Sequence, residues 1–261
     1  MDTQLTGKHA LVCGASSGIG RATAMALGEL GAQVTVLARR RELLDTLVAE
    51  LEASGAVSPR AVQADLDDRV ALGATIDGLL ENAGPVHILV NNSGGPPGGP
   101  ILQASEEAFL QAFGRHTLAN HLLVRRCLPG MTEAGYGRII NVISTSVREP
   151  IPNLGVSNTI RGSVASWAKT VSGELPPGVT INNVLPGFTD TDRLGSLAKG
   201  RADRSGGTTE GVYELWRSQI PEGRLGRPDE LASVIAFLAS PAASYIRGVS
   251  LPVDGGRLRS I

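Results

Sequence analysis

Ser157 and Arg161 are the first two residues of this sequence that could carry out chemistry together. They lie four positions apart in the segment GVSNTIRGSVASWAKTVSGEL, which spans residues 155–175. If that segment is a helix, the two side chains share one face, one turn from each other. A hydroxyl beside a permanent cation can be a catalytic pair, a capping residue next to a surface charge, or the remains of a former site. The rest of the sequence has to decide among these interpretations.

A glycine-rich turn near the start of the chain predicts a site for a phosphate group. Gly14, Gly18 and Gly20 form the pattern GxxxGxG between an apolar run and a helical pattern. Glycines there allow a tight turn, and they let backbone N–H groups approach a pyrophosphate at the N-terminus of the following helix. A βα turn without a ligand is the alternative interpretation. A Walker A loop is excluded because no Gly-Lys-Ser/Thr follows.

NADP(H) is favoured over NAD(H) by three consecutive arginines, Arg39, Arg40 and Arg41. A site for NAD usually has an acidic residue at the end of the second strand, where it binds the ribose 2′-hydroxyl. Here the expected strand ends in Ala38 and the arginines follow. A guanidinium binds a 2′-phosphate through charge-assisted hydrogen bonds, and Arg39 is the best-placed candidate. The arginines could instead simply begin a solvated helix, although cations there are unfavourable to the helix dipole.

Short apolar runs rich in β-branched residues alternate with helical patterns along the whole chain. The segments between these runs repeat apolar residues at spacings of three and four, as amphipathic helices do. Such alternation predicts a parallel sheet with helices on both faces. We therefore expect a single doubly wound α/β domain of Rossmann type over residues 1–261, with about seven strands. The expected strands span residues 9–13, 33–37, 59–64, 86–90, 137–143, 178–184 and 248–253.

Two segments interrupt this alternation, and both follow the carboxyl end of an expected strand. Residues 93–100, SGGPPGGP, are too rich in glycine and proline for a helix or a central strand. Residues 189–224 are polar and glycine-rich, with a helical patch around GVYELWRSQI. Because open α/β sheets bind ligands at that edge, we expect residues 189–224 to form a substrate lid. Its charged residues have both signs and indicate no charge preference for the substrate; they include Arg193, Lys199, Arg201, Arg204, Asp190, Asp192 and Asp203.

The composition excludes several classes of function. The chain has 261 residues, of which 42% are hydrophobic and 19% charged, and its formal net charge is −1. This balance argues against a nucleic-acid partner or an anionic membrane surface. The first residues lack the pattern of a signal peptide, and no apolar stretch approaches the roughly 20 residues that span a bilayer. Two cysteines, Cys13 and Cys127, form no disulfide framework, so we expect a soluble cytoplasmic protein without a metal site.

Several motifs occur in the order in which one enzyme family has them. CGASSGIG (13–20) is similar to that family's TGxxxGIG, VNNSGG (90–95) to its NNAG, LPGFTDTDR (185–193) to its Pro-Gly segment, and residues 223–256 to its consensus ending. On these motifs the chain resembles the short-chain dehydrogenase/reductase family, closest to the 3-oxoacyl-(acyl carrier protein) reductases. The resemblance implies an NADP(H)-dependent oxidoreductase that acts on a small carbonyl compound or alcohol. It also implies cofactor contacts at Gly14, Ser16, Ser17, Gly18, Ile19, Gly20, Arg39, Arg40, Asp65, Leu66, Asn92, Gly94, Arg161, Pro186, Gly187, Thr189 and Thr191.

The same resemblance indicates that the catalytic residues have changed. The family uses Asn, Ser, Tyr and Lys, and its tyrosine transfers the proton. Aligned on GRIINVIS, Ser144 keeps the serine, whereas Ser157 stands at the tyrosine position, Arg161 at the lysine position and His116 at the asparagine position. A serine hydroxyl is a much weaker acid than a phenol, whose pKa is about 10. Arg161 cannot transfer protons, but it can bind ribose hydroxyls of the cofactor or stabilise a developing alkoxide. The proton would then come from water or from His116, whose ordinary pKa of about 6.5 suits proton transfer.

Two functions of different class fit these residues. One is an NADP(H)-dependent reductase or dehydrogenase whose proton relay has been rebuilt. The other is a dinucleotide-binding protein without dehydrogenase activity, acting as a sensor or a partner subunit. The resemblance also implies that the helices containing residues 116–131 and 157–175 pack against a second subunit, so we expect a homodimer or homotetramer. Their apolar residues form this expected interface or an ordinary core stripe: Leu122, Leu123, Val164, Trp167 and Val171.

Overall fold

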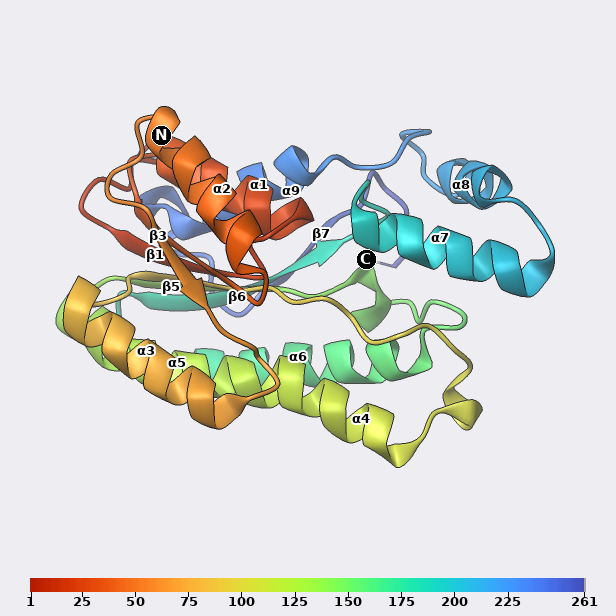
Figure 1. Cartoon of the computed structure of the whole chain (residues 1–261), viewed down its shortest axis with the longest axis horizontal. Coiled ribbons are helices and arrows are strands. Elements are labelled where there is room, and N and C mark those ends of the chain that lie inside the picture. Colours follow the sequence, from red (N-terminus) through yellow and green to blue (C-terminus); the bar gives the residue numbers. More distant parts are fainter. Residues whose placement is uncertain (261) are drawn as a thin grey trace.

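Seven parallel strands form one continuous sheet in the computed structural model, which describes residues 1–260 (Figure 1). The strand order is β3-β2-β1-β4-β5-β6-β7, and each neighbouring pair is parallel. This confirms the expected doubly wound architecture, and no strand boundary differs from the expected one by more than two residues. The strands are β1 (His9–Cys13), β2 (Gln33–Ala38), β3 (Arg60–Gln63), β4 (Ile88–Asn91), β5 (Gly137–Val142), β6 (Val179–Pro186) and β7 (Ser250–Val253).

Helices cover both faces of this sheet. Figure 1 shows α1, α2 and α9 on one face and α3, α5 and α6 on the other, and each group packs its apolar side on the strands. Strands that are buried on both faces need apolar residues at successive positions, which is why they appear as continuous apolar runs. The helices are α1 (Gly18–Glu29), α2 (Arg41–Ala53), α3 (Arg69–Ala83), α4 (Glu106–Phe113), α5 (Ala119–Glu133), α6 (Gly155–Glu174), α7 (Asp192–Ser205), α8 (Thr209–Ser218) and α9 (Pro228–Ala239), with 3-10 turns at Ile101–Gln103, Thr145–Val147 and Pro241–Ala243.

The strand order reverses at β1, and this reversal creates the crevice in which ligands bind. β1 pairs with β2 on one side and with β4 on the other. The chain therefore leaves the carboxyl ends of β1 and β4 toward opposite faces of the sheet. The glycine turn follows β1 and residues 93–100 follow β4, so both segments lie at this crevice.

Residues 189–224 are more regular than expected. They contain two helices, α7 and α8, where the sequence indicated a single helical patch. Thr191 and Thr208 cap these helices, since each hydroxyl oxygen accepts a hydrogen bond from a backbone N–H three residues later. The apolar face of α7 is narrow, and it is buried because α8 packs against it. Both helices share one small core: Leu194, Ala198, Ala202, Val212 and Trp216.

The expected apolar interface on α5 and α6 is partly wrong. Leu123 and Val164 are fully buried inside the chain, so they cannot contact a second subunit. They are buried because these helices turn their apolar sides onto the sheet. Leu122, Trp167 and Val171 lie partly buried at the margin of the same core.

Three further features of residues 1–260 bear on the class of protein. No helix in that range is long and apolar enough to cross a membrane. Nor does that range contain a group of three or more His, Cys, Asp or Glu side chains that could hold a metal ion. Cys13 and Cys127 are buried free thiols, and burial raises the pKa of each to about 12. Neither thiol is therefore a nucleophile.

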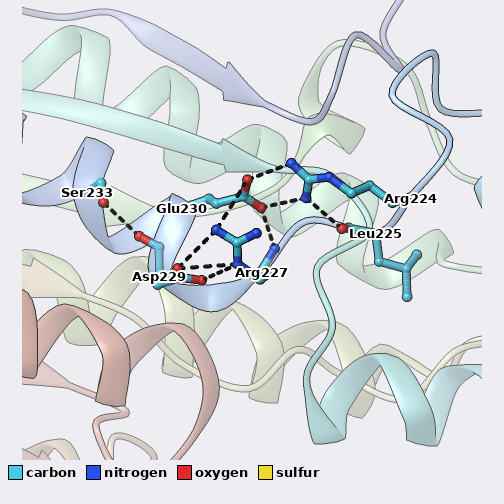
Figure 2. A network of polar contacts seen from close by, with 6 residues as sticks. All are labelled: Arg224, Leu225, Arg227, Asp229, Glu230 and Ser233. Carbon is cyan, nitrogen blue, oxygen red and sulfur yellow. Dashed lines mark hydrogen bonds and ion pairs between the residues drawn. The ribbon is translucent and has the colours of Figure 1, made fainter.

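A polar network holds the end of residues 189–224 to the start of α9 (Figure 2). The two Nη atoms of Arg224 donate to the carboxylate of Glu230 at 2.8 and 2.7 Å. The backbone N–H of Arg227 donates to the same carboxylate at 2.7 Å, and its guanidinium pairs with Asp229 at 3.1 Å. The hydrogen bonds from Arg224, followed by that from Arg227, lower the pKa of Glu230 to about 2.

We expect Glu230→Gln to lower the melting temperature at neutral pH and to have less effect in acid. The pKa of Glu230 is lower in the folded than in the unfolded chain, so its stabilising contribution is present above about pH 4.5 and is lost as the pH falls towards 2. The decrease in melting temperature is small because solvent screens surface ion pairs. Thermal unfolding followed by circular dichroism measures it, with Glu210→Gln as a control outside the network. A difference from wild type that stays constant as the pH falls contradicts this prediction.

Candidate active site

Two adjoining cavities open at the carboxyl edge of the sheet. The central cavity, of about 250 Å³, lies between the glycine turn, the end of β5, α6 and the start of α7. The outer cavity, of about 290 Å³, lies between the glycine turn and the end of β2. Gly14, Ser17 and Gly94 line both cavities. An elongated ligand can therefore extend from one cavity into the other.

The structure brings nearly all the sequence-predicted site residues to these cavities. The central cavity is lined by Gly14, Ser17, Gly18, Ile19, Asn92, Gly94, Ser144, Ser157, Arg161, Pro186, Gly187, Thr189 and Thr191. The outer cavity is lined by Gly14, Ser16, Ser17, Arg39, Arg40, Asp65, Leu66 and Gly94. The two remaining residues lie behind these walls: Gly20 inside α1 beneath the turn, and His116 behind Ser93.

The glycine turn packs so closely that side chains are excluded from it. Gly14 has a φ of +60°, and a Cβ atom there would lie 2.6 Å from the backbone oxygen of Asn92. A Cβ atom at Gly20 would lie 2.3 Å from the backbone oxygen of Gly14. Ser17 is the N-cap of α1, yet within residues 1–260 its side chain makes no capping hydrogen bond. The first N–H groups of α1 are therefore available to an anion such as a phosphate.

Arg39 and Arg40 border the outer cavity from the end of β2. Nη2 of Arg40 donates to the hydroxyls of Ser16 and Ser17 at 2.8 and 3.1 Å. Nη1 of Arg39 lies 3.9 Å from Oδ2 of Asp65, a long contact between two well-exposed side chains. The partners of both guanidiniums are thus neutral or distant, so a phosphate would bind either cation more strongly.

A row of buried amides holds the strands in register beneath the site. Asn91, Asn141 and Asn183 are opposite one another on β4, β5 and β6. Nδ2 of Asn91 donates to Asn141 at 2.8 Å, and Nδ2 of Asn141 donates to Asn183 at 2.9 Å. Asn183 in turn donates to the hydroxyl of Ser250 on β7 at 3.0 Å. The only sequence signal for this row is the asparagines of three mostly apolar strands, one in β4, one in β5 and two in β6.

Ser157 and Arg161 both line the central cavity from α6, which answers the question that their spacing raised. Ser157 is not a capping residue, because the N-cap of α6 is Leu154. Arg161 is not a surface charge, because it is only 8% exposed. Its Nη1 donates to the backbone oxygen of Val142 at 3.0 Å and its Nη2 to that of Ser93 at 3.2 Å. The pair thus belongs to the wall of a cavity.

Arg193 is a second cation of the central cavity, although in the sequence it is only one of the mixed charges of residues 189–224. It lies in the first turn of α7 and donates to the backbone oxygen of Pro96 at 2.5 Å. A Cβ atom on Gly95 would lie 3.4 Å from Nη2 of Arg193 and 3.8 Å from Nη2 of Arg161. The two guanidiniums therefore face the same small region, from elements far apart in the sequence.

These two arginines bring two positive charges to the central cavity, against one carboxylate among the described residues of its lining, that of Asp192. Burial, and then the charge of Arg193, lowers the pKa of Arg161 to about 10. Burial also lowers the pKa of Arg193. Within residues 1–260, neither guanidinium lies within 4.0 Å of a carboxylate. A ligand atom that carries or develops negative charge is therefore favoured here.

Ser144 presents a hydroxyl to the same cavity. It is the N-cap of the 3-10 turn at Thr145–Val147, and its Oγ accepts a hydrogen bond from the N–H of Ser146 at 3.0 Å. That contact uses the oxygen as an acceptor and leaves the hydroxyl hydrogen to be donated. Ser144 can thus donate to a ligand oxygen in the central cavity.

His116 differs from its expected role as a proton donor. It lies in the π-helical turn Gly114–Leu118, is 2% exposed, and its Nδ1 is 2.7 Å from the hydroxyl of Ser93. Burial, and then the charges of Arg161, Arg115 and Arg193, lowers the pKa of His116 to about 2. The imidazole is therefore neutral at physiological pH. The expectation that it delivers a proton as an imidazolium is wrong.

The tyrosine that the family resemblance would require is not supplied from elsewhere in the described chain. Tyr213, the tyrosine of residues 189–224, packs edge-on against Trp216 with ring centroids 5.8 Å apart. It belongs to the core between α7 and α8 and lines neither the central nor the outer cavity of residues 1–260.

Comparison with known sequences shows that this chain is similar to reductases. A family model described as enoyl-(acyl carrier protein) reductase matches residues 14–257. The 3-oxoacyl-(acyl-carrier-protein) reductase FabG of Pseudomonas aeruginosa is 33% identical over 259 residues, which cover 98% of this chain and 99% of that protein. The 3-oxoacyl-(acyl-carrier-protein) reductase of Synechocystis sp. is 36% identical over 259 residues, which cover 97% of this chain and 98% of that protein.

Solved structures give the same result. L-sorbose reductase from Gluconobacter frateurii, in complex with NADPH and L-sorbose, superimposes with a TM-score of 0.94 and 29% identity over the full length of both chains. Actinorhodin polyketide ketoreductase with NADPH superimposes with a TM-score of 0.92 and 31% identity, also over both full lengths.

The low pKa of His116 predicts a stability that falls in mild acid. The unfolded chain takes up a proton on this imidazole below its ordinary pKa of 6.5, whereas the folded chain does so only near 2. The free energy of unfolding therefore decreases as the pH falls below 6.5, and this decrease amounts to about 2 kcal/mol at pH 5. We expect His116→Asn to remove this part of the loss in urea titrations at pH 7 and pH 5.

His9 is an internal reference for this comparison. Burial lowers its pKa to about 4, and because it is retained in the variant, its own contribution to the loss of stability in acid is the same in both proteins. An identical loss of stability in wild type and His116→Asn, or an NMR titration of His116 near pH 6.5, contradicts this prediction.

Proposed function

The chain belongs to the short-chain dehydrogenase/reductase family, and on that basis we propose that it is an NADPH-dependent reductase of a small carbonyl compound. The reaction is of the type that 3-oxoacyl-(acyl-carrier-protein) reductases catalyse, or its reverse. One observation carries the proposal: the two adjoining cavities lead from Arg39 and Arg40, over the glycine turn, to Ser144 and Ser157. That path has the order of a dinucleotide followed by a substrate.

The residues of the outer cavity fit a dinucleotide that carries a 2′-phosphate. The free N–H groups at the start of α1 suit the pyrophosphate, and Arg39 and Arg40 suit the 2′-phosphate. Asp65 and Leu66 border the end of the cavity where the adenine would lie. When bound, NADPH supplies the hydride that carbonyl reduction requires. The remaining expected cofactor contacts line the central cavity, where the nicotinamide half would lie.

The residues of the central cavity suit activation of a carbonyl group. In this proposal Ser144 and Ser157 hydrogen-bond the substrate oxygen. Arg161 and Arg193 stabilise the negative charge that develops on that oxygen during reduction. The proton comes from water, because His116 is neutral and an arginine does not release its proton.

One observation supports a second function, the binding of a dinucleotide without dehydrogenase activity. Within residues 1–260, no tyrosine lines the central cavity, and Ser157 is a poor acid. A protein that binds a dinucleotide without turning it over, as a sensor or a partner subunit, would show this loss. The intact Ser144 and the two guanidiniums support the reductase more strongly, because a binding protein has no need of a group that stabilises an alkoxide.

Three further expectations remain proposals. Residues 1–261 form one domain, and residues 189–224 act as its lid over the substrate. The protein assembles as a homodimer or homotetramer, with support limited to the partly buried Leu122, Trp167 and Val171 at the margin of the core. It acts in the cytoplasm.

NADPH should bind at least about tenfold more tightly than NADH, a difference of about 1.4 kcal/mol. Removing both cations as Arg39→Ala with Arg40→Ala should abolish this preference, because within residues 1–260 the one guanidinium that still lines the outer cavity, that of Arg115, is paired with Asp67. Isothermal titration calorimetry measures both affinities. Arg41→Ala is the matched control, since Arg41 pairs with Asp45 within α2 at 2.8 Å. Equal affinities for the two nucleotides in the wild type contradict the prediction.

Restoring the pair that the family uses should raise the rate of carbonyl reduction. Ser157→Tyr combined with Arg161→Lys supplies a positioned general acid, which contributes about 10²–10⁴-fold. The half-buried Ser157 faces a cavity of about 250 Å³, which has room for the ring. Turnover is measured as NADPH oxidation with a panel of ketones and aldehydes.

Ser157→Phe with Arg161→Lys is the matched control for this variant, because it adds the ring without the hydroxyl. If both double variants bind NADPH and reduce carbonyl compounds at the same rate, the missing acid does not limit the reaction and this prediction is wrong.

A further inference from the structure

A third cavity, of about 260 Å³, lies between α7, α8 and the segment that precedes α6. We call it the lid cavity. It adjoins the central cavity, because Ser144, Leu154 and Leu194 line both. A substrate whose carbonyl group lies at Ser144 can therefore place its other end in the lid cavity.

Much of the wall of the lid cavity is apolar. It includes Leu154, Leu197 and Trp216. Trp216 is 5% exposed and stacks on Phe188, with ring centroids 4.9 Å apart and planes inclined by 17°. Such a surface binds a hydrocarbon segment by removing it from water.

Three arginines line the same cavity, whereas no acidic residue of the described chain does. Arg201 and Arg204 stand three residues apart on α7, and Arg257 follows β7. Within residues 1–260, none of the three lies within 4.0 Å of a carboxylate. Arg217 on α8, in contrast, pairs with Glu210 and does not line the cavity. The three cations of the lid cavity thus have no carboxylate partner in the described chain, like Arg161 and Arg193 of the adjoining central cavity.

The guanidinium of Arg257 is held at the lid cavity by two contacts. Its Cζ atom lies 4.6 Å from the centroid of the Phe188 ring, and its Nη1 donates to the hydroxyl of Thr145 at 3.4 Å. Its Nε is buried and, within residues 1–260, has no hydrogen-bond acceptor. Burying a donor without an acceptor is unfavourable, so the chain itself does not fully satisfy this guanidinium.

We infer that the substrate carries a carboxylate or phosphate group remote from its carbonyl, and that Arg257, together with Arg201 and Arg204, binds this oxyanion in the lid cavity. A guanidinium stacked on an aromatic ring is permanently charged and preorganised for such a group. The apolar wall accommodates the hydrocarbon segment between the carbonyl and the oxyanion. The inference rests on the proposed function, because it assigns the class of substrate for the same site.

The test compares keto acids with their uncharged esters. The probes are methyl-ketone carboxylic acids of increasing chain length, beginning with levulinate, each with its methyl ester and with the keto-alkyl phosphate of the same length. NADPH oxidation gives kcat/KM, and calorimetry gives affinity in the presence and absence of NADPH. We expect the best acid or phosphate to exceed its ester at least about tenfold in kcat/KM. The acid and phosphate series show which oxyanion is preferred.

Arg257→Ala should lower the ratio of kcat/KM for the acid to kcat/KM for its ester at least about tenfold, to near one. Arg201→Ala with Arg204→Ala tests the same site without altering Arg257, in case the first variant does not fold. Arg217→Ala is the control and should keep the preference. Equal kcat/KM for acid and ester, or a preference that survives both variants, overturns the inference and leaves the reductase activity standing.

The two proposals fail in different ways. A lack of NADPH oxidation with every probe contradicts the proposed function. In that case calorimetric binding of the acids that is lost in Arg257→Ala still supports the oxyanion site, whereas equal binding, or no binding, of acid and ester overturns it.

Discussion

The buried guanidinium of Arg161 is the interaction on which the candidate site depends. A permanent charge that is 8% exposed is unfavourable unless oxygen atoms surround it. The backbone oxygens of Val142 and Ser93 supply two such atoms. They belong to the end of β5 and to the segment after β4, so the arginine connects both to α6. Because two carbonyl dipoles neutralise the charge only in part, the cavity beside it favours a ligand with negative charge.

Burial of an arginine does not by itself make a site, as Arg138 demonstrates. It is 3% exposed, donates to the backbone oxygens of Gly178 and Ser240, and lies 4.2 Å from the centroid of the Tyr136 ring. Its partners satisfy it, and it does not line the central, the outer or the lid cavity. Arg161 differs because it has a cavity on one side. The cations of the site keep their charge across the physiological pH range, and the buried imidazole stays neutral, so the site stabilises charge without titrating itself.

Much of the fold could be predicted from local sequence patterns. Apolar runs and helical spacings located all seven strands, because residues buried on both faces of a parallel sheet must be apolar along the strand. The glycine turn could be predicted because its close packing excludes side chains. The position of Arg39 and Arg40 at the end of β2 followed from strand length, and that of Ser157 beside Arg161 from the spacing of an α-helix. Each of these features is local, so a short segment determines it.

Which side chains meet across elements depends on the tertiary structure alone. It placed Arg193 beside Arg161, although α7 and α6 are separated by β6, and it stacked Arg257 on Phe188. It also buried His116 behind Ser93, which makes the imidazole neutral, where the sequence alone suggested a proton donor. Desolvation and the fields of neighbouring charges depend on chain segments that are distant in the sequence. The sequence by itself therefore determined the sheet, the glycine turn and the residues available for chemistry. The packing of α6, α7 and the segment after β4 decided their charge states and their neighbours.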